Sequence, residues 1–149
     1  MKQFLAILLI GTALTLGCQK QPEAVDPSLL QHLAQVRERL KQELGEKYEE
    51  PVPDPTPAQL KRGRDLYRQL CAPCHGSRGE GRGKTGEGLL VKPPALTDPK
   101  LAHFFSDQAR LRIIRKGIKG TPMMGWGNVL SEPDLLAVFL YIRTLAKTK

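Results

Sequence analysis

The sequence predicts an all-α fold, in which a helical arm precedes a small helical domain. Three segments carry helix-start signals: Asp26-Pro27-Ser28, Ser106-Asp107-Gln108, and Ser131 with Asp134 three residues later. Apolar residues after these signals recur at the spacing of one helix face. No segment alternates apolar and polar residues as a half-buried strand does, so a sheet is not expected.

Length and composition narrow the class of protein. The 149 residues suffice for one modest domain with an appendage and exclude a large multidomain enzyme. With 40% apolar and 26% charged residues, the chain is neither collagen-like, nor wholly disordered, nor a multi-span membrane protein. Aromatic residues make up only 5%, which leaves the core short of bulk unless a large apolar cofactor fills it.

The net charge of +8 is unevenly distributed. Residues 19–57 hold 5 basic and 8 acidic side chains, whereas residues 58–149 hold 17 basic and 7 acidic ones. The basic part predicts a negatively charged partner and an encounter steered by the electric field. Nucleic acid is the least expected such partner, because the chain has no nucleic-acid-binding signature and its N-terminus argues for export.

The N-terminus is typical of a targeting segment. Residues 4–16 are an almost unbroken apolar run of 13 residues, well below the roughly 20 that span a bilayer. The run ends in Thr15-Leu16-Gly17-Cys18, which resembles a bacterial lipobox with threonine where an aliphatic residue is usual. We expect a lipoprotein-type signal over residues 1–17 and lipidation at Cys18; an uncleaved anchor and ordinary cleavage are the alternatives. Several acyl chains give stable anchoring, on the periplasmic side of the cytoplasmic membrane.

Residues 18–57 are expected to contain the anchor, an amphipathic helical arm and a Pro-rich linker. The arm carries an apolar stripe with spacings of 4, 3, 4 and 4: Leu29, Leu33, Val36, Leu40 and Leu44. Such a helix covers its own domain, a partner or the membrane surface. Residues 51–57, with four prolines, favour an extended linker. Fully extended, arm and linker would separate the domain from its anchor by up to roughly 50 Å.

The strongest chemical signal is Cys71-Ala72-Pro73-Cys74-His75, the pattern C-x-x-C-H. It is typical of covalent c-type haem attachment, because two thiols one helical turn apart can bond both vinyl groups and the next imidazole can coordinate iron. A zinc ribbon needs a second pair of ligands, and no cysteine remains once Cys18 is assigned to the lipobox. A thioredoxin-type pair needs a βαβ unit, for which the strand pattern is absent.

The sequence around this motif, about residues 58–145, resembles the class I cytochromes c. Gly63 and Tyr67 stand eight and four residues before the first cysteine, in the family's spacing, and Val138 and Tyr141 match contact positions of its closing helix. The resemblance implies that these four residues pack where two helices cross, with Gly63 permitting close backbone approach. It also implies a cytochrome c-like domain over residues 58–149, with three to four helices around one covalent haem.

The resemblance further implies the ligands of the iron. Pro94-Ala95-Leu96 resembles the family's Pro-x-Leu, whose proline carbonyl accepts the proton of the axial His75 and orients its ring; Pro93 is the competing choice. Residues 120–127, GTPMMGWG, resemble the distal loop whose methionine coordinates iron. Counting back three residues from the loop's tryptophan selects Met123.

Three alternatives stay open around this loop. Met124 occupies the position where the family usually has proline, so it is the alternative ligand. Trp126 either donates its indole N–H to a haem propionate or only packs. His103, and more remotely His32, are rival distal ligands, although each is more simply a surface or capping histidine.

The helix that begins near residue 106 is rich in basic side chains. Its apolar side is expected to contain Leu111, Ile114 and Ile118. Around them stand four basic residues: Arg110, Arg112, Arg115 and Lys116. The simplest interpretation is a solvated face, and docking of a partner is the alternative.

Coordination by His and Met would leave the iron without a vacant site, so the haem would change oxidation state without binding substrate. The expected function is that of a membrane-tethered electron carrier, not an enzyme. It would carry single electrons between respiratory partners, with a quinol-oxidising complex as donor and a terminal oxidase or reductase as acceptor. A fixed haem subunit of a larger complex is the first alternative, and a peroxidase-like or gas-sensing haem protein is the second.

Overall fold

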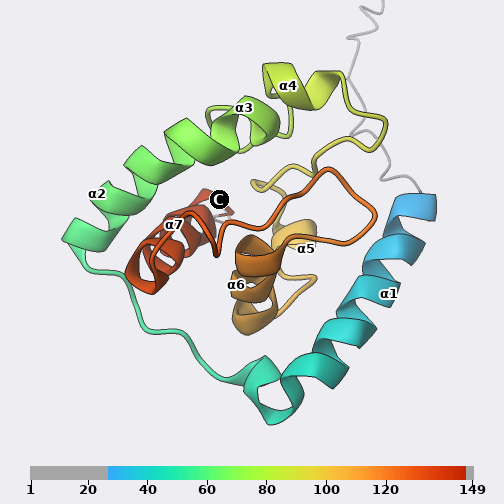
Figure 1. Ribbon diagram of the computed structural model, residues 1–149, viewed down its shortest axis with the longest axis horizontal. Coiled ribbons are helices and arrows are strands. Elements are labelled where there is room, and N and C mark those ends of the chain that lie inside the picture. The colour runs from blue at the N-terminus through green and yellow to red at the C-terminus, as the bar shows by residue number, and fades with distance from the viewer. Residues whose placement is uncertain (1–26, 147–149) are drawn as a thin grey trace, which may run out of the picture.

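The computed structural model describes residues 27–146, and only these are discussed below; of Leu29 the side chain is not described. Within them lie seven α-helices, one 3-10 helix, one π-helix and an isolated β-bridge, with no strand. In Figure 1 the earlier helices, in blue and green, lie around the later ones, in orange and red. The predicted all-α fold is confirmed.

Helices α2 (Pro57–Leu66) and α7 (Glu132–Leu145) cross at the centre of the main core. Gly63 lies at the crossing, where an added Cβ atom would overlap the carbonyl of Ala137. The rings of Tyr67 and Tyr141 pack with centroids 5.4 Å apart, and Val138 is buried beside them. The predicted crossing of the first and last helices of the domain is therefore confirmed.

Side-chain caps explain where these helices begin. Thr56 and Gln59 form a reciprocal capping box at the start of α2, in which Gln59 N–H donates to Thr56 Oγ1 at 3.2 Å. Ser131 accepts from the backbone N–H of Asp134 at 3.4 Å, as the sequence predicted for the last helix. Ser106 caps α6 (Asp107–Lys116) in the same way.

The chain between α2 and α6 is built from short helices. A π-helix, η2 (Tyr67–Cys71), follows α2 directly and leads into α3 (Ala72–His75). Two further single-turn helices, α4 (Lys84–Glu87) and α5 (Pro99–Ala102), follow before α6. The π-helix was not predicted from the sequence; π turns are rare and are frequent at functional sites.

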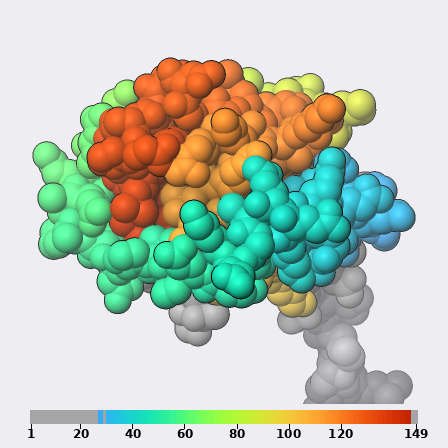
Figure 2. Space-filling view, turned by 60° about the horizontal axis from the view of Figure 1, so that its bottom comes forward, coloured from blue at the N-terminus to red at the C-terminus, as the bar shows by residue number. Residues whose placement is uncertain are grey.

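The arm helix α1 (Pro27–Leu44) and the 3-10 helix η1 (Gly45–Glu49) lie back against the domain. Val36, Leu40 and Tyr48 form a second small core with Ala109 of α6. Figure 2 shows the arm as a continuous band across the face of the domain. The expected amphipathic helix is confirmed, and it covers its own domain.

The Pro-rich linker is fastened to α7. Val52 packs against the main core, and Arg143 donates to the carbonyls of Val52 at 3.2 Å and Pro53 at 3.0 Å. The interpretation of arm and linker as an extended spacer of roughly 50 Å is therefore wrong. Burial of the arm's apolar stripe on α6 lowers the free energy of the protein relative to exposure of that stripe to water.

No helix between residues 27 and 146 is long and apolar enough to cross a membrane. The predicted signal segment and Cys18 lie outside the described residues.

Candidate functional site

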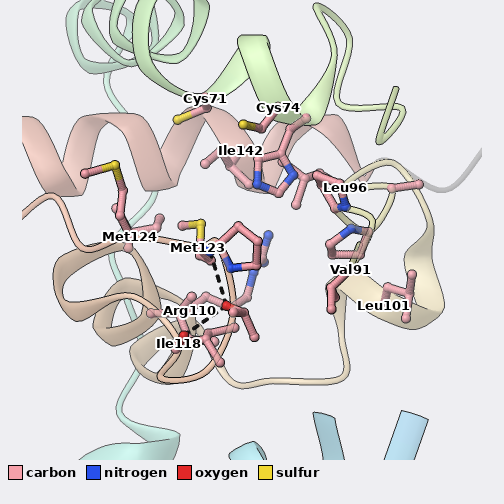
Figure 3. Close-up of a pocket in the computed structure, with 18 of the residues that line it drawn as sticks. Cys71, Cys74, Val91, Leu96, Leu101, Arg110, Ile118, Met123, Met124 and Ile142 are labelled. Atoms are coloured by element: carbon pink, nitrogen blue, oxygen red, sulfur yellow. Dashed lines mark hydrogen bonds between the residues drawn. The ribbon is translucent and has the colours of Figure 1, made fainter. Parts of the chain in front are cut away.

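A cavity of about 320 Å³ opens between α3, α5, α6 and the loop that follows α6. Its lining is almost entirely apolar, with leucine, isoleucine, proline and phenylalanine side chains predominating. All six residues that the sequence singled out as cofactor contacts line it: Cys71, Cys74, His75, Pro94, Met123 and Trp126. Figure 3 shows the two cysteines on one side of the cavity and Met123 in its middle.

The two cysteines are half-buried free thiols. Cys71 ends the π-helix and Cys74 lies in the short helix that follows, so both side chains reach the same cavity. Burial, with a smaller effect of Cys74, raises the pKa of the Cys71 thiol to about 12. A Cys71 thiol held in its protonated form at the wall of an apolar cavity is poorly suited to thiolate ligation of a metal.

His75 ends α3 and also lines the cavity. Burial lowers the pKa of its imidazole, and the backbone carbonyl of Pro94 raises it by a smaller amount. Nδ1 is buried and makes no hydrogen bond of good geometry within residues 27–146, so Pro94 acts on it as a nearby dipole. A neutral imidazole with Nδ1 near a carbonyl is the form that can coordinate a metal through Nε2.

Backbone hydrogen bonds hold this short helix in position. Gly81 N–H donates to the carbonyl of His75 at 2.7 Å, and Gly83 N–H donates to that of Cys74 at 3.1 Å. The buried hydroxyl of Tyr67 donates to the carbonyl of Gly76 at 2.7 Å, which anchors the residue after His75 to the main core. The C-x-x-C-H segment is therefore fixed from both sides.

The loop after α6 is tied to the end of that helix. Ile118 N–H donates to the Met123 carbonyl at 3.0 Å, and Trp126 N–H donates to the Ile114 carbonyl at 2.9 Å. Gly117 has a φ of 73°, and an added Cβ atom would overlap the Met123 carbonyl. These contacts define where the methionines emerge from the loop.

The two neighbouring methionines differ in exposure. Met123 is partly buried, and its N–H donates to Thr121 Oγ1 at 3.2 Å. Met124 is 60% exposed and lies at the edge of the cavity in Figure 3, whereas Met123 lies between Arg110 and the cysteines. Trp126 also lines the cavity and packs against the main core.

The two rival histidines change rank. His103 was the nearer rival in the sequence, but it is exposed and lies by a separate polar depression, not the apolar cavity. His32 of the arm lines the cavity, and its Nε2 is buried with no hydrogen-bond partner among the described residues. Sequence spacing gave no sign of this, because the approach depends on how α1 docks.

The interpretation of the basic residues of α6 as a solvated face is wrong for most of them. Arg112 pairs with Glu43 of the arm, with Nε to Oε1 at 2.7 Å. Arg115 pairs with Glu132 at the start of α7 through two hydrogen bonds. Of the four, only Lys116 is exposed; Arg112 and Arg115 end on carboxylates, whereas the Arg110 guanidinium lies beside the Phe139 ring.

Arg110 is the site residue that sequence reasoning missed. Its side chain is only 12% exposed, lines the cavity, and holds its guanidinium 5.2 Å from the centre of the Phe139 ring. Its ion pair with Asp107 is long, at 3.6 Å, because Asp107 accepts a 3.0 Å hydrogen bond from Arg143. Burial lowers the pKa of the Arg110 guanidinium, which shows that water solvates it poorly.

The residues around the cavity fit a large, flat, mainly apolar cofactor attached to two thiols. The alternative of a zinc site finds no support, since residues 27–146 contain no group of three His, Cys, Asp or Glu side chains placed to hold a metal ion. A partly buried imidazole, two free thiols and a thioether sulfur around one apolar cavity are the donor set of a c-type haem site.

Comparison with known proteins agrees with this donor set. Residues 58–142, more than half of the chain, match the family described as "Cytochrome C oxidase, cbb3-type, subunit III". The chain belongs to this family of c-type cytochromes. As a c-type cytochrome it carries covalently bound haem, and the matched residues contain the C-x-x-C-H motif and the methionine loop of the cavity.

One curated protein and one solved structure are each similar to 63% of this chain. FixP, a "Cbb3-type cytochrome c oxidase subunit" of Azorhizobium caulinodans, is 32% identical over 95 residues, which are 63% of this chain and 29% of FixP. A chain of the reducing HAO-like protein complex of Kuenenia stuttgartiensis superposes with a TM-score of 0.52 and 25% identity, over 63% of this chain and 45% of that one. The cytochrome therefore spans less than a third of its curated relative and less than half of its structural one.

Proposed function

We propose that the protein is a mono-haem c-type cytochrome that is tethered to the membrane and carries single electrons between respiratory-chain partners. The observation that carries the proposal is the convergence of Cys71, Cys74, His75 and Met123 on one apolar cavity. Three of these residues are adjacent in sequence, but Met123 comes from a loop 48 residues after His75. Two potential iron ligands on one cavity suit a site closed to substrate.

Each residue has a proposed part in holding the cofactor. Cys71 and Cys74 would form the two thioethers, and His75 and Met123, rather than Met124, would supply the ligands of the iron. The Pro94 carbonyl orients the His75 ring and increases its basicity. Trp126 closes one edge of the cavity. When bound, the haem supplies a one-electron iron couple.

The protein's contribution to electron transfer is to keep this site dry and rigid. The apolar lining disfavours the more highly charged ferric state, and a thioether ligand also favours ferrous iron, so both raise the reduction potential. Short backbone hydrogen bonds on either side of His75 and Met123 limit movement of the ligands between oxidation states. Such a site suits an electron carrier rather than an enzyme.

The proposed anchor is the lipid of a modified Cys18, on the periplasmic side of the cytoplasmic membrane. Residues 1–17 are then the signal segment, residues 18–57 the anchor, arm and linker, and residues 58–149 the cytochrome domain. The packing of α1 on α6 gives this division a different meaning, because the arm covers the domain instead of spacing it from the membrane. The tether is then the short stretch before Pro27.

The proposed partners are redox proteins with acidic docking surfaces, such as a quinol-oxidising complex as donor and a terminal oxidase or reductase as acceptor. The excess of basic side chains in residues 58–149 supports electrostatic steering toward such surfaces. Because Arg112 and Arg115 are engaged within the molecule, exposed lysines such as Lys116 and Lys119 are the better candidates for these contacts.

A fixed subunit of a larger complex is the second candidate. It is favoured by the family of the domain and by FixP, which is itself named as an oxidase subunit. The argument that the leucine stripe of the arm is buried on another chain loses force, because Leu33, Val36 and Leu40 are buried within this chain.

Two measurements test the proposal. The purified protein should carry one haem per chain that resists extraction by acidified acetone, and Cys71→Ala or Cys74→Ala should leave little stable holoprotein. The reduced protein should not bind carbon monoxide at neutral pH; binding would favour the peroxidase-like or gas-sensing alternative. Purification in mild detergent then separates the two candidates, since a carrier runs alone and a subunit copurifies with its complex in fixed ratio.

A further inference from the structure

Two polar side chains line an otherwise apolar cavity: His32 of α1 and Arg110 of α6. Two other polar side chains of the lining are already engaged. Thr121 Oγ1 donates to the Ile118 carbonyl at 2.9 Å, and Lys92 Nζ donates to the Glu87 carbonyl at 2.6 Å. Apart from Trp126 and the residues of the C-x-x-C-H motif, His32 and Arg110 are the remaining N–H donors of the lining.

The charged guanidinium of Arg110 lies in an apolar environment, where desolvation of a charge is unfavourable. Its side chain is 12% exposed, and its one nearby carboxylate, Asp107, makes its hydrogen bond to Arg143 instead. Desolvation of a buried guanidinium is unfavourable in free energy when no anion is well placed beside it. An anion that enters the site offsets this penalty. An apolar cavity with a poorly paired arginine in its wall is thus suited to an apolar ligand that carries acidic groups.

His32 of α1 is a second polar side chain at the cavity whose ring nitrogen has no hydrogen-bond partner among the described residues. Its Nε2 is buried with no partner among the described residues, and it reaches the cavity from a helix that lies outside the family match of residues 58–142. Helices α1 and α6 are held together by the Arg112–Glu43 pair and by the core of Val36, Leu40 and Ala109. His32 therefore reaches the cavity from a helix packed on the one that carries Arg110.

The chemistry of haem says which of its groups would meet them. Its two vinyl groups and its two propionates lie on opposite edges of the porphyrin ring, so attachment through the cysteines directs the carboxylates away from α3. In Figure 3, Arg110 lies on the far side of the cavity from Cys71 and Cys74, and α1 passes beyond it on that side.

We propose that Arg110 and His32 bind the haem carboxylates, which makes the arm helix α1 a wall of the cofactor site and not only a cover for α6. This assignment rests on the proposed haem attachment at Cys71 and Cys74. Arg110 offers two parallel N–H groups to a carboxylate, and His32 offers one. Neither residue contacts iron.

The test uses the full-length holoprotein and three readouts: the propionate bending mode in the resonance Raman spectrum, the midpoint potential, and hydrogen exchange along α1. Arg110→Met should shift the Raman mode and lower the potential, because a positive charge near the haem disfavours the ferric state. A tenfold change in the ratio of oxidised to reduced protein at fixed ambient potential, 59 mV for one electron, is the expected size. His32→Leu should shift the Raman mode and speed exchange in α1.

Matched variants separate binding from structure. Lys116→Met removes a charge from an exposed position of the same helix, and His103→Leu removes an exposed histidine, so neither should change the Raman mode. Arg110→Lys keeps the positive charge but lacks the two parallel N–H groups of the guanidinium. The midpoint potential should therefore stay close to that of the wild type, while the Raman mode still shifts. This second variant decides the matter if Arg110→Met fails to assemble.

Different failures have different meanings. Covalent haem with an unchanged Raman mode in both Arg110→Met and His32→Leu overturns the carboxylate assignment and leaves the proposed function standing. Loss of an iron ligand in His32→Leu, seen as a high-spin spectrum, also overturns it, because His32 then coordinates iron. A wild-type protein without covalent haem overturns the proposed function, and this assignment with it.

Discussion

Adjacent methionines at the cavity provide a test of the distal ligand that has its own control. Side chains of neighbouring residues diverge, so only one of Met123 and Met124 can coordinate an iron in the cavity. Met123→Ala should abolish the ferric methionine–iron charge-transfer band, lower the midpoint potential and open the iron to carbon monoxide. Met124→Ala should leave all three properties unchanged.

The cost of the control substitution follows from exposure. Truncating a fully buried methionine costs about 2 to 5 kcal/mol. Met124 is 60% exposed, so its buried share corresponds to about 1 to 2 kcal/mol of unfolding free energy. The holoprotein of Met124→Ala should therefore stay folded at room temperature, which makes its spectrum interpretable.

The assay is the ferric absorption spectrum of each purified variant, followed by a redox titration. A band that survives in Met123→Ala and disappears in Met124→Ala would refute the argument from exposure and move the ligand by one residue. A band that survives both substitutions would mean that the sixth ligand lies elsewhere. His32, which lines the cavity, would then be the first candidate to test, ahead of the exposed His103.

Three further predictions follow from the packing and the N-terminus. Gly63→Ala should destabilise the protein by about 3 kcal/mol or more in chemical unfolding, because the new methyl group meets the backbone of α7. The control Gly88→Ala, with no contact closer than 3.9 Å, should change the unfolding free energy by less than about 1 kcal/mol. Equal stability of the two variants would contradict the close helix crossing. Tyr67→Phe should cost about 0.5 to 1.5 kcal/mol, because it removes one hydrogen bond from the Gly76 carbonyl, which still accepts from Gly79 N–H at 3.1 Å, and an unchanged unfolding midpoint would count against the Tyr67 hydrogen bond. Cys18→Ser should release the protein into the soluble periplasmic fraction or leave the signal segment uncleaved, with haem incorporation intact; membrane attachment that persists in this variant, together with an unlipidated wild-type mass, would show that the anchor is not there.

Local sequence rules predicted the helices well because their signals are local. The caps at Ser106 and Ser131 are short-range hydrogen bonds, and each appears in the structure as its residue type suggests. The apolar stripe of the arm predicted a helix, and the burial of Leu33 and Val36 bears this out. Gly63 was interpretable from its spacing to Cys71, and the structure places it where an added Cβ atom would overlap the carbonyl of Ala137.

What the sequence could not supply was the destination of the arm and linker. A narrow apolar stripe is satisfied equally by its own domain, by a partner or by a membrane, and periodicity does not distinguish them. The deciding contacts, such as Arg112 with Glu43 and Arg143 with the Val52 carbonyl, join residues 69 and 91 positions apart. Proline residues predicted an extended backbone correctly but gave no information on whether that backbone was free.

The same distinction explains why Arg110 was missed, and it gives the site its most specific feature. Arginines at positions 110, 112 and 115 are one residue type within a single helix, and the sequence interpretation placed all three on a solvated face. Only the docking of α1 and α7 on either side of α6 makes Arg112 and Arg115 structural ion pairs and leaves Arg110 facing an apolar cavity. The family match covers Cys71, Cys74, His75 and the methionine loop, whereas the position of Arg110 at the cavity depends on packing between elements that are distant in the sequence.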